Sequence, residues 1–171
     1  MFVDTVITDY NGIVLFEPHL LQQRYGGAIE EGTDLFTRFT TTDEGDRVLA
    51  EGLIVPVLAI DDAPYKVIVR RSSEPEAARG PVLVENGVFP LRVEQGLVVA
   101  DLVVLREWTV GLGWKPVDVE PGSYGVMVRG FRVLDAAGSR IIEAGYEFVL
   151  EPRDALPPLT ADVGKNMRVL R

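Results

Sequence analysis

Apolar and polar residues alternate along most of this chain, and turn residues separate the alternating runs. A period of two is typical of a β-strand with one buried face. The runs that show it are residues 2–8, 12–17, 53–60, 65–71, 81–85, 87–93, 124–131 and 140–150. Short strands joined by glycine- and proline-containing turns favour an all-β fold. We predict an antiparallel β-sandwich or a partly open barrel.

Four turn sequences lie between these runs. Asn11-Gly12 and Asn86-Gly87 accept the positive φ angles of tight turns, so each predicts a hairpin between the runs on either side of it. Pro121-Gly122 has the sequence of a type II turn and leads into the run that starts at Tyr124. Residues 135–139 reverse the chain after that run and predict a further hairpin.

Helical signals are few. Pro18 is a suitable first helical residue, but Gly26-Gly27 should end any helix after about two turns. We therefore expect at most one short helix, near residues 19–27. Residues 72–81 lack periodicity and predict a mobile loop that connects two sheets. With 171 residues, the chain is expected to form a single domain, residues 1–171.

Composition excludes several kinds of chemistry. The chain has no cysteine, which excludes disulfides and thiolate metal sites, and we expect a cytoplasmic protein. His19 is the single histidine, so a Ser-His-Asp triad and a three-histidine zinc site are both excluded in practice. Neither a secretory signal nor a membrane span is expected from the hydropathy pattern. We predict a protein that is not an enzyme and binds no cofactor.

The acidic residues are concentrated early in the chain. The formal net charge is −9, and residues 1–62 hold twelve acidic and only three basic residues. Such a chain repels nucleic acid, because nucleic-acid binding depends on lysine and arginine. A protein with a basic surface would be attracted to it. We therefore expect a basic protein partner and no contact with nucleic acid or membrane.

The segment DLFTRFTTTDEGD, residues 34–46, is a candidate for the binding surface. It is predicted to be a strand with an aromatic residue on each face, followed by an acidic loop, and residues 61–62 add a second acidic turn. The predicted partner-binding residues are Asp34, Phe36, Phe39, Asp43, Glu44, Asp46, Asp61 and Asp62. No catalytic residue and no metal ligand are assigned. One alternative is a calcium- or carbohydrate-binding sandwich that uses the same loops, and a carboxylate-based hydrolase is another.

Three further acids stand out by their surroundings. Asp101 lies between apolar residues, which indicates either a buried acid with a raised pKa or a charge that protects an edge strand. Glu143 and Glu147 share one strand face four residues apart, about 13 Å, which is too far for a glycosidase pair. Both are expected to be solvated.

Residues 80–135 resemble the competence protein J nuclease inhibitors. The resemblance rests on the order PVLVENGVFPLRVEQG, then apolar strands, then VEPGSYGVMV. In that family an Asn-Gly hairpin is followed by a Leu-Pro-x-Gly-x-Tyr turn, whereas this chain has Glu120-Pro121-Gly122-Ser123-Tyr124. The resemblance implies a cytoplasmic β-sandwich that inhibits a nuclease without catalysis. It assigns no functional residue, and the oligomeric state is left open.

Overall fold

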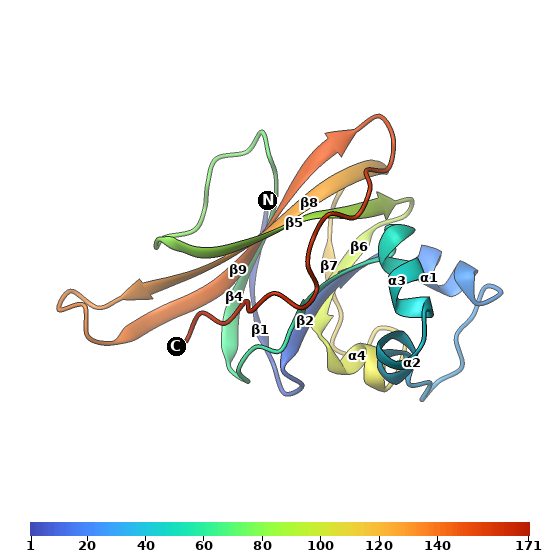
Figure 1. Ribbon diagram of the computed structural model, residues 1–171, viewed down its shortest axis with the longest axis horizontal. Coiled ribbons are helices and arrows are strands. Elements are labelled where there is room, and N and C mark those ends of the chain that lie inside the picture. The colour runs from blue at the N-terminus through green and yellow to red at the C-terminus, as the bar shows by residue number, and fades with distance from the viewer.

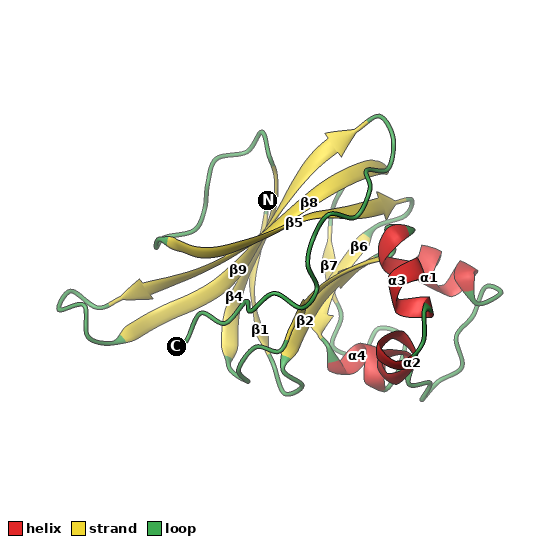
Figure 2. Ribbon diagram, viewed as in Figure 1, coloured by secondary structure: helices red, strands yellow, loops and turns green.

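The computed structural model describes residues 1–171 and contains two β-sheets with four helices at one end (Figures 1 and 2). The strands are β1 (Phe2–Ile7), β2 (Gly12–Phe16), β3 (Ile54–Leu58), β4 (Pro64–Arg71), β5 (Val82–Val93), β6 (Leu97–Asp101), β7 (Lys115–Val117), β8 (Gly122–Leu134) and β9 (Ile141–Arg153). The helices are α1 (Pro18–Arg24), α2 (Leu35–Thr41), α3 (Glu44–Ala50) and α4 (Val103–Arg106). None of these helices has the length and apolar character that crossing a bilayer requires.

The strand order places distant segments side by side. One sheet has the order β1-β4-β9-β8-β5 and the other the order β3-β2-β6-β7. All neighbours are antiparallel except β4 and β9, which are parallel. The predicted β-rich fold is therefore confirmed. The prediction of purely antiparallel pairing was wrong at β4–β9, because alternation along a strand carries no information about the direction of its neighbour.

A single hydrophobic cluster of 40 buried residues joins the two sheets. Tyr124, Val126 and Val128 of β8 enter it from the five-stranded sheet, and every residue of β2 enters it or lies buried beside it from the other. Trp108 is fully buried, with its ring centroid 6.0 Å from that of Phe16. The core thus lies between the sheets and continues toward the helical end.

The hairpin predicted from residues 135–139 is confirmed. Strands β8 and β9 pair antiparallel over their whole length and form the longest ribbon of the molecule (Figure 1). The Asp135 carboxylate accepts hydrogen bonds from the backbone N–H groups of Ser139 (2.8 Å) and Arg140 (3.3 Å). Gly138 has a φ of 70°, which glycine adopts without strain.

The two hairpins predicted from Asn-Gly pairs were wrong. Residues 82–93 form one strand, β5, and its register against β8 shifts between Asn86 and Phe89. The Asn86 side chain donates to the Asp162 carbonyl (2.6 Å) and accepts from the Asp162 N–H (3.0 Å), so the C-terminal segment occupies the place of a neighbouring strand. Asn11-Gly12 does lie in a turn, but β1 and β2 on either side belong to different sheets.

The expectation of at most one short helix was also wrong. Residues 34–46, predicted to be a strand and an acidic loop, form α2 and the start of α3. Threonines favour strands, but here the hydroxyls of Thr40, Thr41 and Thr42 donate to carbonyls of the preceding helical turn. Helix α1 matches the predicted helix near residues 19–27.

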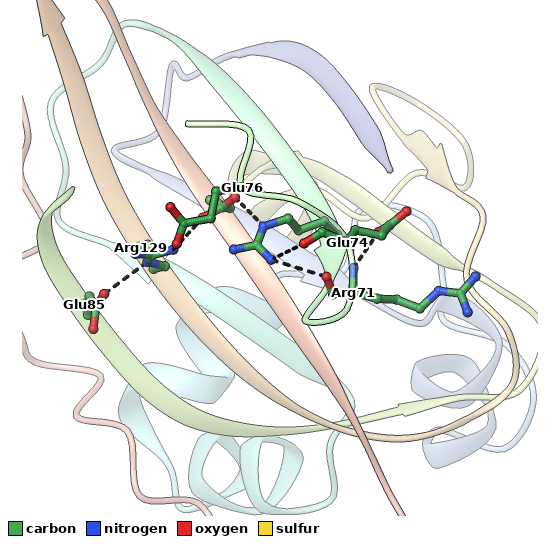
Figure 3. A network of polar contacts seen from close by, with 7 residues as sticks. Arg71, Glu74, Glu76, Glu85 and Arg129 are labelled. Carbon is green, nitrogen blue, oxygen red and sulfur yellow. Dashed lines mark hydrogen bonds and ion pairs between the residues drawn. The ribbon is translucent and has the colours of Figure 1, made fainter. Parts of the chain in front are cut away.

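The loop at residues 72–81 connects β4 and β5 of one sheet, so the prediction that it links two sheets was wrong. It is held against the outer face of that sheet. Figure 3 shows Arg129 of β8 between Glu76 of the loop and Glu85 of β5, with both ion pairs at 3.0 Å. The Glu74 side chain accepts from the Arg71 N–H at 2.7 Å, and its carbonyl accepts from Arg70 at 3.1 Å.

Candidate protein-binding groove

An apolar pocket of about 260 Å³ lies beside α2, at strand β3. Helices α2, α3 and α4, strand β3 and the C-terminal segment all contribute to it. Its lining residues are Phe36, Phe39, Thr40, Gly45, Asp46, Leu49, Ile54, Pro56, Leu58, Leu102, Leu105 and Val163. Small-molecule sites typically have volumes of about 300–1,000 Å³. The pocket is therefore of a size for one or two side chains of a protein partner.

A second hollow of about 540 Å³ adjoins the first, since Phe36, Leu58 and Leu102 line both. Its remaining lining residues are Tyr10, Asn11, Ala59, Ile60 and Arg168. We call the two hollows together the α2–β3 groove. It runs from α3 to the turn before β2, and β3 is an edge strand of its sheet.

Asp34 sets the position of α2. Its carboxylate accepts from the Thr37 N–H at 2.9 Å and from the Thr37 hydroxyl at 2.6 Å, which caps the helix. The hydroxyl bond is the main reason why the pKa of Asp34 lies below its usual value. Arg106 of α4 also lies 3.3 Å from the Asp34 carboxylate. This predicted contact residue therefore holds two helices together beside the groove.

Phe36 and Phe39 lie three residues apart on α2 and both line the groove. Leu35 is fully buried beneath them, so it fixes the rotation of the helix. The Tyr10 ring meets Phe36 edge to face, with centroids 5.4 Å apart. Arg106 donates to the Tyr10 hydroxyl at 2.6 Å and holds that ring in place. The two aromatic residues identified from the sequence thus form one half-buried apolar surface.

The three acids of the α3 region differ in their contacts. Asp43 pairs with Arg47 at 2.8 Å, and both side chains are exposed. Glu44 accepts from the Tyr25 hydroxyl at 2.8 Å, and burial together with this bond raises the pKa of Tyr25 to about 12. Asp46 lines the groove, is exposed and has no hydrogen bond or ion pair. Of these acids, Asp46 is the one free to meet a basic group.

Asp61 and Asp62 lie in the turn between β3 and β4. Asp61 pairs with Arg171 at 2.6 Å and Arg168 at 3.7 Å, so it fastens the C-terminal segment. Asp62 accepts from the Asn11 N–H at 2.6 Å. Through Arg168 and Asn11, which line the second hollow, these acids border the groove at the end away from α3.

The charge asymmetry of the sequence is reduced in space. Asp4, Asp34 and Asp61, all from the first 62 residues, pair with cations from later segments. Their partners are Lys115, Arg106, Arg168 and Arg171. The linear count of charges therefore overstates the negative field of this region. Asp46 and Asp62 are carboxylates at the groove without a cation partner.

The structure offers little for metal binding. No three histidine or acidic side chains lie together in an arrangement that could hold a metal ion. The two acidic loops, at residues 43–46 and 61–62, therefore do not form the calcium cluster that was one alternative. Glu147, expected to be solvated, is fully buried and paired with Arg70 at 2.6 Å. This correction follows from the loop at residues 72–81, which covers that face.

Several groove residues were missed from the sequence. Leu58 and Leu102 lie in or next to strands and have no local pattern that marks an exposed side. Val163 and Arg168 belong to the C-terminal segment, 120 residues or more along the chain from α2. Only the tertiary arrangement brings them together. Tyr10, placed directly before the Asn11-Gly12 turn, was the one with a usable signal.

Two solved structures are similar to this one. The first is ComJ from Bacillus subtilis, an inhibitor of the DNA-degrading activity of NucA, with a TM-score of 0.50 and 12% sequence identity over 90% of this chain and 96% of ComJ. The fold is similar to that of ComJ. The second is the product of crocagin biosynthetic gene J, with a TM-score of 0.50, 17% identity and coverage of 90% and 99%. No protein-family model and no curated protein matches the sequence.

The similarity to ComJ confirms the resemblance seen in residues 80–135 and extends it to most of the chain. At these identities the comparison establishes the fold and transfers no residue. The α2–β3 groove therefore stands on the geometry of this chain.

Proposed function

We propose that this protein is a non-catalytic inhibitor that acts in the cytoplasm and binds a protein with a basic surface, such as a nuclease. The partner docks at the α2–β3 groove. Phe36 and Phe39 supply apolar contacts, and Asp46 meets a lysine or arginine. Anchors of this kind typically dominate the affinity of an interface. The groove, with its unpaired Asp46, is the observation that carries the proposal. The similarity of the fold to that of a nuclease inhibitor supports it.

Affinity capture from an extract of the source cell tests this proposal. Immobilised wild-type protein is expected to retain a basic protein with DNA-degrading activity at low salt and to release it at high salt, because charge pairs near a surface are screened. Added free protein should suppress that activity. The double variant F36S/F39S should retain none of it.

The matched control is L83S/L134S. Leu83 and Leu134 are exposed by 45% and 40% and lie on β5 and β8, outside the groove. This variant should capture the partner like the wild type, and circular dichroism should show that both variants are folded. Equal capture by F36S/F39S and the wild type, or no captured nuclease, would contradict the proposal.

A further inference from the structure

Strand β1 is an exposed edge of the five-stranded sheet. It lies outermost in the order β1-β4-β9-β8-β5, and four of its six residues are exposed. Val3 and Ile7 are among them, with exposed fractions of 49% and 65%. An exposed edge strand of this kind is a ready template for another strand.

The backbone of β1 has groups on its outer side that β4 does not use. Thr8 donates its N–H to the Ala63 carbonyl at 3.0 Å, so hydrogen-bonded pairs with β4 recur at every second residue before it. Pro64, which has no N–H, lies opposite Ile7 and fits a position without such bonds. The N–H and C=O groups of Val3, Thr5 and Ile7 therefore point away from β4. Thr5 confirms this direction, because its N–H bonds the Asp4 carboxylate at 2.7 Å.

The charge that could protect this edge is neutralised. Edge strands commonly carry a charged residue that opposes pairing with another chain. Asp4 is the only charged residue of β1, and Lys115 of β7 lies 3.0 Å from its carboxylate. The hydrogen bond from Lys115 is also the main cause of the lowered pKa of Asp4. The edge thus presents no net charge to an incoming strand.

We propose that two copies of this chain associate through β1, antiparallel about Thr5. The sequence around Thr5 is self-complementary, because Val3 and Ile7 lie at equal distances on either side of it. In this register Val3 of each copy faces Ile7 of the other, and Thr5 faces Thr5. The outward groups of these three residues then form about six backbone hydrogen bonds, two of which replace the bond from the Thr5 N–H to the Asp4 carboxylate in each copy. Such a contact is isologous and closes as a dimer, which joins the two sheets into one.

This dimer is independent of the proposed function. None of the residues that line the α2–β3 groove belongs to β1. Variants of the edge should therefore leave partner capture unchanged. A second copy fits the edge better than an unrelated strand. Val3 and Ile7 of one copy face apolar residues of the other, and neither edge carries a net charge.

Sedimentation equilibrium over a range of concentrations tests the proposal. The wild type is expected to form dimers. Thr5→Pro should be monomeric with an unchanged circular dichroism spectrum, because the Thr5 N–H is not used in pairing with β4. V3K/I7K should also be monomeric, since lysines of the two copies would face each other. V3E/I7K should recover the dimer, because each new glutamate would face a new lysine of the other copy.

The control is Leu83→Lys. Leu83 is 45% exposed on β5, at the opposite edge of the five-stranded sheet from β1. This variant should form dimers like the wild type. If V3K/I7K fails to fold, amide hydrogen exchange in the wild type takes the place of this variant. The exchange of the Val3 and Ile7 N–H groups should then become slower as the protein concentration rises. A monomeric wild type, a dimer that survives Thr5→Pro, or V3E/I7K as monomeric as V3K/I7K would overturn the proposal.

Discussion

Arg70 and Glu147 form a buried ion pair on the outer face of the five-stranded sheet. The Nε of Arg70 lies 2.6 Å from Oε1 of Glu147, and the side chains are exposed by only 5% and 0%. Arg129 contacts the other oxygen of Glu147 at 3.3 Å. Glu147, Arg129 and Glu85 lie directly opposite one another on β9, β8 and β5. The pair is thus the inner end of a ladder of alternating charge that reaches solvent at Glu85.

Replacement of Glu147 by alanine is expected to destabilise the protein strongly. The variant leaves the Arg70 guanidinium buried without its carboxylate, and breaking such a pair typically costs about 3–5 kcal/mol. Urea unfolding followed by circular dichroism measures the loss. Glu85→Ala, at the exposed end of the ladder, should cost less than about 1 kcal/mol. The double variant R70M/E147L should recover most of the stability lost in Glu147→Ala, and equal effects of Glu147→Ala and Glu85→Ala would contradict this account.

The ladder also holds the loop at residues 72–81. Glu76 contacts Arg129 at 3.0 Å and is itself largely exposed, so Glu76→Ala should release the loop without unfolding the sheet. We expect faster amide exchange in residues 72–81 and unchanged exchange in β8 and β9, measured by mass spectrometry. Glu120→Ala, which removes a looser pair with Arg71 at 4.0 Å, is the matched control and should leave loop exchange unchanged. Faster exchange throughout the sheet in Glu76→Ala would argue against a local role.

Gly45 fixes the corner between α2 and α3. A Cβ atom at this position would collide with the carbonyl oxygen of Phe39, a backbone atom that cannot move without moving α2. Gly45→Ala is therefore expected to cost about 1–3 kcal/mol and to deform the α2–β3 groove. Thermal unfolding measures the first effect, and partner capture the second. Gly96→Ala is the control, since its Cβ would meet no atom within 4 Å, and a tolerated Gly45→Ala would contradict this packing.

A hairpin could be predicted where the alternating pattern was followed by residues that form a local turn. The β8–β9 hairpin was found because Asp135 and Gly138 form a local turn that needs no distant partner. The Asn86-Gly87 pair has an equally good local signal, but Asn86 pairs with Asp162, 76 residues away. A tertiary contact therefore overrode the local preference.

The helices at residues 34–50 were missed because two interpretations of one pattern compete. Phe36 and Phe39 lie on opposite faces of a strand but on one face of a helix. The cap at Asp34 and the buried side chain of Leu35 favour the helix. In the sequence, an Asp-x-x-Thr cap is a weaker signal than alternation. The error changed the predicted secondary structure of the binding surface. It did not change the choice of Phe36, Phe39 and Asp46, which meet in one pocket.

The sequence leaves two interpretations of Asp101: a buried acid, or a charge that protects an edge strand. Asp101 ends β6, which lies between β2 and β7 and is not an edge. Burial is the main reason why its pKa is raised above 3.8, and the charges of Asp9 and Asp62 add to this effect. Hydrogen bonds from the Asp9 N–H (2.9 Å) and the Val103 N–H (3.3 Å) oppose it only in part.

The raised pKa of Asp101 predicts how stability depends on pH. Between 3.8 and the raised pKa, the folded protein binds more protons at this site than the unfolded chain, so folding gains stability as pH falls through that range and loses it as pH rises. The free energy of unfolding of the wild type should therefore increase relative to Asp101→Asn as pH falls, as measured by urea unfolding at a series of pH values.

Asp135 gives the opposite control. Backbone N–H groups, first that of Ser139, lower its pKa below 3.8, so the wild type should lose stability relative to Asp135→Asn as pH falls through that value. The same sign for both variants would show that Asp101 is not held in a desolvated position.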